Sequence, residues 1–397
     1  MHPNVPHLRF PEFHGEWCVS TIGEQFDLYS GNTPSRLNKE HFEGNVNWIT
    51  SGELKEHYIS DTKEKISEDA ATANNLKLLH PGTFVIAIYG LEADGVRGTG
   101  SITCKESTIS QACMAFTQKG DVKNEFLYSW YKKHGNIIGI KYAQGTKQQN
   151  LSYDILEKFH IAYPSQDEQD KLIKFISLLD ERIASQSKLI EKLESLIKGI
   201  NQRVFMNSGN NYKLGEICEI RSGYSGSQLL SKKGLKVSRI ETISGHKVNM
   251  ERVGYVAPFE SSENYRLRVG DILFSNINSV EYIGNTAFID KDYDLYHGMN
   301  LLRLTPNHIV VIPFYLYLLL NTNRMLNRFK AVCNKAVSQA SINQTELGKT
   351  VVQIPPINTQ EQICELYQAL YTKLETESHT KSLFQNQKQY LLRQMFI

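Results

Sequence analysis

The amino-acid sequence is internally repeated, with a period of about 190 residues. This period is far longer than a solenoid unit, so it indicates a duplicated domain. Short motifs recur in the same order in both halves, and strand-like apolar runs at 82–88 and 270–274 recur with them. The clearest matches are Ile22-Gly23-Glu24 with Leu214-Gly215-Glu216, Ser30-Gly31 with Ser222-Gly223, Gln149-Asn150-Leu151 with Ala340-Ser341-Ile342, and Pro164 and Glu168-Gln169 with Pro356 and Glu361-Gln362.

Each half runs into a long segment with the pattern of a coiled-coil helix. Mostly apolar residues step alternately by four and three positions, which is the a/d seam of a coiled coil. Helices of roughly 38 residues would be about 57 Å long. The predicted seam is Leu172, Ile176, Leu179, Ile183, Gln186, Ile190, Leu193, Ile197, Ile200 and Val204 in the first segment and, in the same register, Ile363, Tyr367, Leu370, Leu374, Glu377, Lys381, Phe384, Lys388, Leu391 and Met395 in the second.

The natural partner of each predicted helix is the other one, because a seam of this length is unstable in water. We expect the two helices to form an antiparallel coiled coil. The alternative is that each helix packs only on its own domain. That alternative fits the length less well, since helices of globular domains usually end near about 20 residues.

The segments between the long helices show mixed patterns. Strands are expected at 47–50, 83–89, 272–275 and 300–304, and helices at 125–134 and 313–328. The sequence therefore predicts an α+β fold: two mixed α/β domains joined by two long antiparallel helices, with an internal pseudo-twofold repeat. The predicted boundaries are 1–166 for the first domain, 167–206 for the central helix, 207–357 for the second domain and 358–397 for the C-terminal helix.

Composition narrows the class of protein. The net charge of +2 is too small to indicate a nucleic-acid partner by itself, but residues 206–355 carry 17 Lys and Arg against 12 Asp and Glu, whereas residues 1–166 carry 16 against 19. The six cysteines form no C-x-x-C pair, which argues against a zinc site or a disulfide framework. No signal-like N-terminus or membrane-length apolar run is present, so we expect a cytoplasmic protein.

Motifs for catalysis are missing from the sequence. The Pro355-Pro356 pair is flanked by isoleucines and lacks the Asn or Asp and the aromatic residue of an amino-methylase loop. The glycines of 95–100 have the wrong spacing for a dinucleotide-binding loop and indicate a hairpin connection. No nucleotide-hydrolase, metalloprotease or esterase motif occurs, and the carboxylates form no recognisable metal cluster. These features favour a role in recognition, with no catalytic residue, metal or cofactor in the chain.

Polar and basic loops are the candidates for contacting DNA. Amide side chains can pair with adenine and cations with phosphates, although each loop could equally be a solvated turn. The first loop carries Lys147, Gln148, Gln149 and Asn150, and the equivalent stretch of the second half carries Lys335, Ser338 and Gln339. Isolated arginines that could contact DNA or simply face solvent are Arg36, Arg97, Arg221 and Arg239.

Taken together, these features resemble the specificity subunits of Type I restriction-modification enzymes over essentially the whole chain. In that family a Gly- and Gln-rich loop, a strand, a proline and a Glu-Gln pair lead into each long helix. The first half has this order in Gly145 to Leu151, Pro164 and Glu168-Gln169. The second half departs from it, with Ala336-Val337-Ser338-Gln339 in place of Gly145-Thr146-Lys147-Gln148.

The resemblance implies a function without catalysis in this chain. Each domain would read one half of a bipartite double-stranded DNA target, and the helices would set the spacing and dock the partners. Those partners would be two methylase subunits, which use S-adenosylmethionine, and up to two restriction subunits, which use ATP and Mg²⁺, in a bacterial or archaeal cytoplasm. The alternative is a duplicated coiled-coil adaptor that binds proteins and not DNA.

Overall fold

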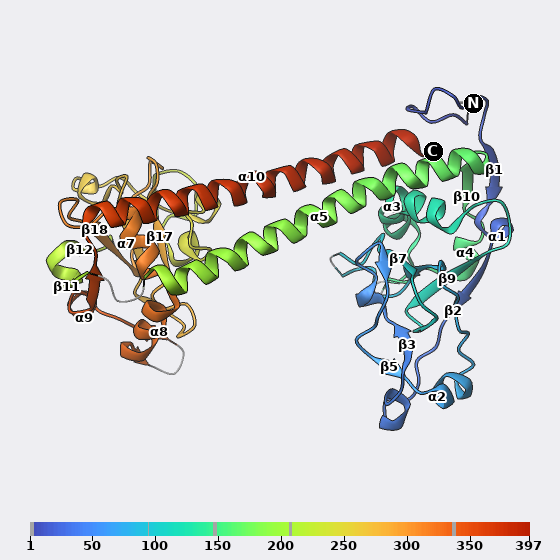
Figure 1. The fold of residues 1–397 in the computed structure, drawn as a ribbon, viewed down its shortest axis with the longest axis horizontal. Coiled ribbons are helices and arrows are strands. Elements are labelled where there is room, and N and C mark those ends of the chain that lie inside the picture. The colour runs from blue at the N-terminus through green and yellow to red at the C-terminus, as the bar shows by residue number, and fades with distance from the viewer. Residues whose placement is uncertain (1–3, 94, 146–148, 206–208, 336–338) are drawn as a thin grey trace. The chain divides into compact units, whose positions relative to one another are not determined.

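The computed structural model describes residues 4–93, 95–145, 149–205, 209–335 and 339–397 (Figure 1). The chain forms two compact units, Met1–Lys188 with Ser378–Ile397 and Leu189–Glu377, which we call unit 1 and unit 2. Each unit contains one mixed α/β domain and a stretch of both long helices. The sequence-based boundaries treat each long helix as a separate segment, whereas in the structure each helix is divided between the units.

The domain of unit 1 is made of short strands and, apart from α3, short helices. In chain order the elements are β1 (Cys18–Thr21), α1 (Ile22–Gln25), β2 (Phe26–Ser30), η1 (Lys39–Phe42), β3 (Val46–Ile49), η2 (Ser51–Glu53), β4 (Tyr58–Ile59), β5 (Lys65–Ile66), α2 (Glu68–Ala73), β6 (Phe84–Ala87), β7 (Gly100–Thr103), β8 (Ser107–Ile109), β9 (Cys113–Gln118), α3 (Asn124–Tyr142), α4 (Tyr153–Leu156) and β10 (His160–Tyr163).

The main sheet of unit 1 has the strand order β2-β9-β6-β7-β4, and a second sheet has the order β5-β3-β8. Strand β6 shows that the main sheet is buried on both faces, because its side chains alternate between two cores. Phe84 and Ile86 pack in one core with Phe126 of α3. Val85 and Ala87 belong to another core, on the opposite face. The predicted strand at 83–89 is therefore confirmed, and its continuous apolar run follows from its double-sided burial.

The domain of unit 2 is likewise made of short strands and short helices. Its elements are β11 (Asn210–Lys213), α6 (Leu214–Ile217), β12 (Cys218–Ser222), β13 (Leu235–Val237), η3 (Ile240–Ile243), η4 (Met250–Arg252), β14 (Gly254–Val256), η5 (Ser262–Tyr265), β15 (Ile272–Ser275), β16 (Ile277–Asn278), β17 (Thr286–Phe288), β18 (Leu301–Pro306), α7 (Pro313–Leu320), α8 (Asn323–Val332), β19 (Asn334–Lys335), β20 (Ala340–Ser341), α9 (Gln344–Gly348) and β21 (Val351–Ile354).

The main sheet of unit 2 has the strand order β12-β18-β15-β17 and is also buried on both faces. On one face, Phe274 of β15 packs edge-on against Phe329 of α8, with ring centroids 5.0 Å apart. The prediction of one continuous helix at 313–328 is wrong. It is two helices, because α7 ends at Leu320 and Thr322 caps α8 by accepting a hydrogen bond from the Met325 N–H.

The internal repeat is visible in how each domain begins and ends. In unit 1, β1 pairs antiparallel with β10, so that Thr21 lies opposite His160. In unit 2, β11 pairs in the same way with β21, so that Lys213 lies opposite Val351. Each first strand leads into a four-residue helix, α1 or α6. The repeated Ile-Gly-Glu and Leu-Gly-Glu motifs are these two helices.

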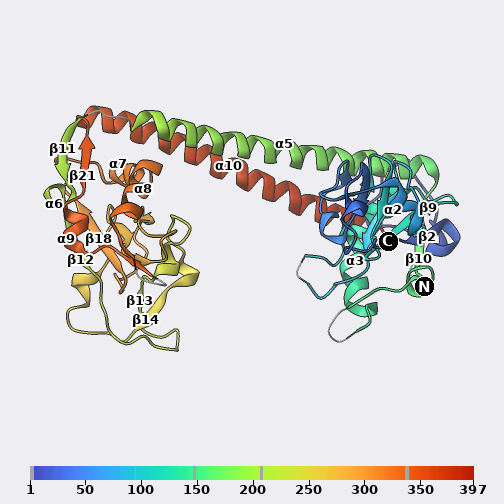
Figure 2. The same ribbon diagram turned by 90° about the horizontal axis from the view of Figure 1, so that it is seen from below.

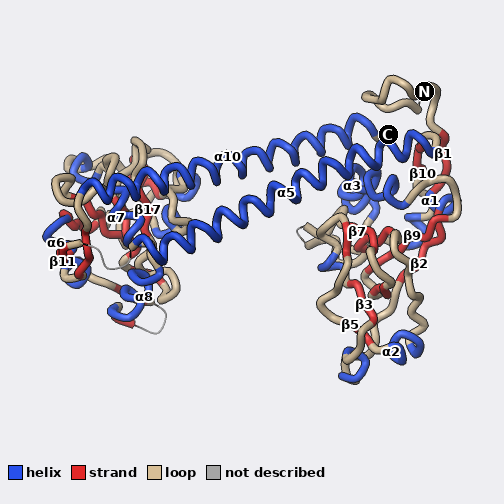
Figure 3. The backbone as a smooth tube through the Cα atoms, viewed as in Figure 1, coloured by secondary structure: helices blue, strands red, loops and turns tan. Residues whose placement is uncertain are grey.

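The two long helices are α5 (Gln166–Val204) and α10 (Ile357–Met395), each of 39 residues. Within each unit, the stretches of the two helices lie side by side and antiparallel (Figures 1 and 2). In unit 1, Lys388 forms an ion pair with Asp180. In unit 2, the hydroxyl of Tyr367 donates a hydrogen bond to Asn201. Figure 3 contrasts these continuous helices with the short strands of each domain.

All twenty positions of the predicted seam are buried or half-buried. The most buried include Leu172, Ile176, Ile197 and Tyr367, which contribute to the cores of the two units. One of the polar residues in the seam is Lys388, which is stabilised there by its ion pair with Asp180 of the other helix. Among the described residues, no helix is long and apolar enough to cross a membrane.

Candidate nucleic-acid interface

The first predicted DNA-contacting loop lies in unit 1, between α3 and α4. Gln144 and Asn150 exchange backbone hydrogen bonds of 2.8 and 2.9 Å. Lys147 and Gln148 fall outside the described residues. Gln149 is anchored to the neighbouring loop, because its carbonyl accepts from the Leu91 N–H at 3.0 Å and its N–H donates to Glu92 at 2.8 Å.

Arg97 is brought to this loop by the turn between β6 and β7. This turn is the predicted hairpin connection at residues 95–100. Arg97 donates from Nη2 to Oε1 of Gln149 at 2.9 Å. Its Nε atom is buried, with no hydrogen-bond acceptor among the described residues. Two predicted site residues from different segments, Arg97 and Gln149, are therefore held together in the structure.

The equivalent stretch of unit 2 begins in β19 and ends in β20. Strands β19 and β20 pair so that Lys335 lies opposite Ala340, and β16 continues the sheet on the other side of β20. Lys335 and Gln339 are exposed, while Ser338 falls outside the described residues. In both repeats, antiparallel backbone pairing therefore joins residues on either side of this stretch.

The other three predicted arginines are paired with carboxylates on the surface. Arg36 makes two hydrogen bonds of 2.8 Å with Glu64, and its guanidinium lies over the ring of Phe42. Arg221 donates from Nε to Glu219 at 2.7 Å. Arg239 lies 3.5 Å from a carboxylate oxygen of Glu241. These pairs reduce the positive charge that each arginine offers to a ligand.

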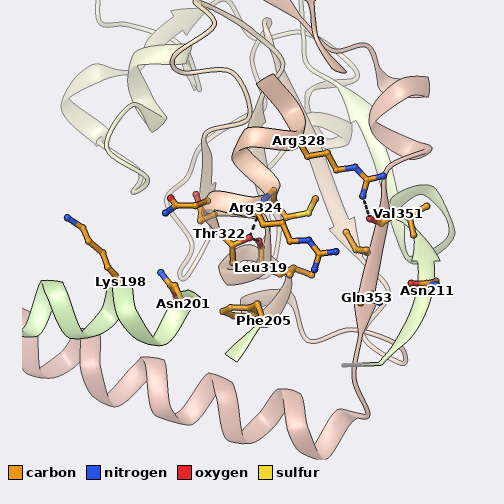
Figure 4. Close-up of a pocket in the computed structure, with 14 residues that line it drawn as sticks. Lys198, Asn201, Phe205, Asn211, Leu319, Thr322, Arg324, Arg328, Val351 and Gln353 are labelled. Atoms are coloured by element: carbon orange, nitrogen blue, oxygen red, sulfur yellow. Dashed lines mark hydrogen bonds between the residues drawn. The ribbon is translucent and has the colours of Figure 1, made fainter. Parts of the chain in front are cut away.

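Figure 4 shows a cavity of about 300 Å³ in unit 2, between the end of α5, helix α8 and strand β21. Lys198 reaches it from α5, and Arg324 and Arg328 reach it from α8, with Arg328 donating to the Val351 carbonyl at 2.6 Å. Two buried amide oxygens on its lining, of Asn321 and Gln353, have no hydrogen-bond donor among the described residues. The cavity therefore offers both cations and unpaired acceptors.

A second cavity of unit 2, of about 440 Å³, lies beside β12 and β18. We call it the two-arginine cavity, since Arg221 and Arg303 both line it. Arg303 was missed in the sequence, although it is the single charge in the apolar run Leu301 to Leu304. A lone cation inside a strand that is otherwise buried was the signal that could have identified it.

A third cluster, in unit 1, joins the domain to the long helices. Nε2 of His57 lies 2.8 Å from Glu125 of α3, and Nδ1 lies 3.3 Å from Asp180 of α5. The imidazole is stacked on Tyr128, with centroids 3.9 Å apart, and Asp180 also pairs with Lys388 of α10. Sequence reasoning missed this cluster because its members are far apart along the chain and match no motif.

The charges of this cluster are mutually dependent. Burial opposes protonation of His57, but the carboxylates of Asp180 and Glu125 outweigh it and raise the pKa of His57. Burial acts against the carboxylate of Asp180 as well, yet His57 and Lys388 lower the pKa of that group. The nearby Lys132 is half-buried, and burial together with the positive charge of Lys388 lowers its pKa to about 8. The cluster is thus a fixed network of charges at the junction between domain and helices.

The family model for the Type I restriction modification DNA specificity domain matches this sequence twice, at residues 14–195 and 208–383. The putative type I restriction enzyme MjaX specificity subunit of Methanocaldococcus jannaschii is 38% identical over 188 residues, which are 46% of this chain and 44% of that protein. The MjaIX specificity subunit of the same organism is 28% identical over 46% of this chain and 42% of that protein. The chain thus aligns with less than half the length of each of these two relatives.

Other similarities extend over nearly the full length. The MjaVIII specificity subunit of M. jannaschii is 22% identical over 96% of this chain and 94% of that protein. Among solved structures, the S subunit of a Type I restriction-modification system from M. genitalium has a TM-score of 0.60 at 18% identity and covers 99% of both chains. A chain from a study of complex assembly in the type I R-M system has a TM-score of 0.61 at 17% identity. At these identities the structures show a shared fold.

Proposed function

Because this chain belongs to the Type I restriction modification DNA specificity family, with two copies of the family's domain, we propose that it selects the DNA site for a Type I restriction-modification complex. Each domain reads one half of a bipartite, asymmetric duplex. The observation that carries this proposal is the duplication itself. The same framework of paired strands and a capped helix occurs in both units, while the loops and charges that it supports differ.

The predicted loops of both domains and the cavities of the second domain supply the chemistry for reading DNA. Amide groups such as Gln149 can pair with base edges, and cations such as Lys335 and Arg97 can contact phosphates. Only the second domain has an excess of positive charge. We propose that partner subunits contribute much of the phosphate attraction, which dominates affinity for DNA, to the first half-site.

The long helices act as a spacer between the two domains that read DNA. A helix of 39 residues is about 58 Å long at 1.5 Å per residue. Half-sites one helical turn apart are separated by about 34 to 36 Å, which is within that length. The number of base pairs that are not read between the half-sites is then set by the length of α5 and α10.

The same helices provide the docking surface for two methylase subunits, at equivalent places because the chain is internally repeated. Large apolar side chains are exposed along both helices, where a partner could cover them. They are Leu178, Leu189 and Leu196 on α5 and Leu366, Leu383 and Tyr390 on α10. The methylase subunits bind S-adenosylmethionine and methylate adenine, and up to two restriction subunits use ATP and Mg²⁺ to translocate and cut.

The proposal is tested by co-expressing the chain with its cognate methylase subunit in a host that lacks adenine methylation. Every methylated adenine is then mapped by single-molecule sequencing. We expect one split motif with a constant gap and one methylated adenine on each strand. A stable complex that neither binds duplex DNA nor methylates it would favour the protein-binding adaptor instead.

The spacer role has a sharper test, based on the antiparallel register. A heptad inserted after Leu193 in α5 is matched by a heptad inserted after Leu374 in α10. Asn201 of α5 and Tyr367 of α10 are paired, and on each helix the insertion point lies between this pair and the boundary of unit 2. The paired insertion should lengthen the unread gap and leave both half-sites unchanged. The insertion after Leu193 alone is the control, since it shifts the seam out of register. An active paired variant with an unchanged gap would contradict the spacer role.

A further inference from the structure

Arg303 is a buried cation without a carboxylate partner among the described residues. It lies on β18, is only 8% exposed and lines the two-arginine cavity. Its Nη1 donates to the Arg266 carbonyl at 3.1 Å, but its Nε finds no acceptor among the described residues. A buried charge is costly unless it is paired, so this arrangement indicates a partner that is not part of the chain.

Arg221 places a second positive charge at the same point. It lies on β12 directly opposite Arg303 in the antiparallel pairing of β12 with β18. Like charges in this position destabilise a sheet. The carboxylate of Glu219 pairs with Arg221, which leaves the charge of Arg303 uncompensated. An anion bound in the cavity beside both guanidinium groups would compensate this remaining charge of Arg303.

The rest of the cavity has the chemistry of an anion site. Its other lining residues offer hydroxyl and amide groups, and no Asp or Glu is among them. The single histidine is neutral near pH 7, because burial lowers the pKa of His297 to about 4. The remaining lining residues are Ser222, Ser261, Asn264, Tyr265 and Gln344.

Carboxylates do lie on the adjoining surface, but they are engaged elsewhere. Asp271 accepts hydrogen bonds from the Arg268 N–H at 2.8 Å and from Thr305 at 2.6 Å. Glu263 lies 3.9 Å from Arg266. Both carboxylates line an adjoining cavity together with Arg303, but neither is paired with Arg303 among the described residues, so the two-arginine cavity stays positive.

We propose that the two-arginine cavity binds one backbone phosphate of the DNA at the half-site read by the second domain; this rests on the proposed function. A phosphate suits the site better than a base edge, because Arg303 is recessed within the sheet and held by the Arg266 carbonyl. A recessed guanidinium cannot extend into a groove, whereas phosphates project from the duplex. Paired guanidinium groups bind phosphate oxygens through strong, charge-assisted hydrogen bonds.

The first domain does not share this contact. The positions that match Arg221 and Arg303 in the repeat are Tyr29 and Ala115, which are also paired across neighbouring strands. Tyr29 instead lies beneath the ammonium group of Lys77, 5.1 Å from the ring centroid. The cavity therefore gives the second domain a phosphate contact of its own, consistent with the positive charge of residues 206–355.

The test uses the complex of this chain with its methylase subunits and measures the Kd for a duplex with the mapped target over a range of salt concentrations. Arg221→Gln and Arg303→Gln should each weaken binding roughly tenfold at low salt. The slope of log K against log salt should fall by about 0.9, the value for one phosphate. Arg252→Gln is the matched control, since it removes an exposed arginine of the same domain outside the cavity. It should leave both quantities close to those of the wild type.

A chemically modified duplex identifies the contacted group. A neutral methylphosphonate, placed at one phosphate after another, should weaken wild-type binding at one position of the second half-site. At that position it should have no effect on Arg221→Gln. Thermal denaturation reports whether Arg303→Gln is folded, and the exposed Arg221 gives an independent variant if it is not.

Three outcomes would overturn the phosphate site. In the first, Arg221→Gln binds DNA as the wild type does. In the second, it loses discrimination at one base pair with an unchanged salt slope, which indicates a base contact. In the third, it fails to assemble with the methylase subunits, which indicates that the cavity binds a carboxylate of a partner protein. If the wild-type complex itself binds no bipartite duplex, the proposed function fails instead. The two failures are therefore distinguishable.

Discussion

Gln169 and Gln360 make the same three hydrogen bonds in the two units. Oε1 of Gln169 accepts from the N–H at the start of α3, and Oε1 of Gln360 accepts from the N–H at the start of α7. Nε2 of each donates to the carbonyl three residues before the first residue of that helix and to the carbonyl of the proline five residues before the glutamine itself. Gln360, and not the Gln362 suggested by the sequence match, is therefore the counterpart of Gln169.

Replacing either glutamine should destabilise its unit. Gln169→Ala or Gln360→Ala removes three hydrogen bonds between the long helix and its domain, and each glutamine is fully buried. We expect a loss of roughly 2 to 4 kcal/mol in the free energy of unfolding, measured by denaturant titration. Gln387→Ala, at an exposed position of α10, is the control and should change little. Equal effects of all three would mean that the two hydrogen-bond sets do not hold helix to domain.

A lack of space for a side chain explains the glycine in the repeated Ser-Gly motif. A Cβ atom on Gly31 would lie 1.8 Å from the Ile109 carbonyl oxygen, and one on Gly223 would lie 1.9 Å from that of Gly298. Gly31→Ala and Gly223→Ala should therefore each lower the melting temperature strongly, because backbone must move. Gly52→Ala meets no atom within 4 Å and should be tolerated. A stable Gly223→Ala would show that the two backbone segments are not held this closely.

Arg9 and Glu168 form an ion pair at the start of α5. Two hydrogen bonds of 2.8 and 2.7 Å join them, and Glu168 is buried. Arg9→Met should destabilise the chain by about 3 kcal/mol or more, since it leaves a buried carboxylate unpaired. Arg36→Met breaks a similar pair that is exposed, and should have little effect because solvent screens it. Chemical denaturation of the two variants compares them directly; equal losses would contradict the role of burial.

The His57 cluster makes stability depend on pH. The pKa of His57 is raised in the folded state, so the protonated imidazole stabilises the fold at pH values below its unfolded pKa of about 6.5. This stabilisation is lost as the pH rises through the folded pKa. The melting temperature should therefore fall as pH rises above about 6.5. Lys132 acts in the opposite sense, because its pKa is lowered, to about 8, and it gives a gain as pH rises above that value.

The variant His57→Gln isolates this effect. Its melting temperature should fall less steeply than that of the wild type between about pH 6.5 and 8. His80→Gln is the control, since His80 is largely exposed and 3.8 Å from its nearest carboxylate. If His57→Gln and the wild type showed parallel pH profiles, the imidazole would not be charged by Asp180 and Glu125.

The regular patterns of the sequence were sufficient to predict the repeat and the long helices. The spacing of residues such as Leu172 and Ile176 reports the helical period directly, because one face of each helix is buried. Strands such as β15 were also predicted, since Ile272 to Ser275 is a short apolar run. The break at Asn321 and Thr322 was missed because apolar residues keep a helical spacing across it.

Most of the candidate site could not be predicted in this way. The contact between Arg97 and Gln149 depends on a hairpin turn meeting a loop 52 residues later. The pairing of Arg221 with Arg303 depends on the register of β12 and β18, which no local pattern encodes. Lys147, Gln148 and Ser338 remain predictions, since they lie outside the described residues. Tertiary contacts therefore decide which of the polar residues can act together.

Exchanging one domain shows whether each domain reads its own half of the target. Residues 206–355 are replaced by the corresponding segment of a relative with a different target, and methylated adenines are mapped with the same methylase subunit. We expect one half-site to change to that of the relative, while the other half-site and the gap are retained. A change in both half-sites, or in neither, would contradict independent reading by the two domains.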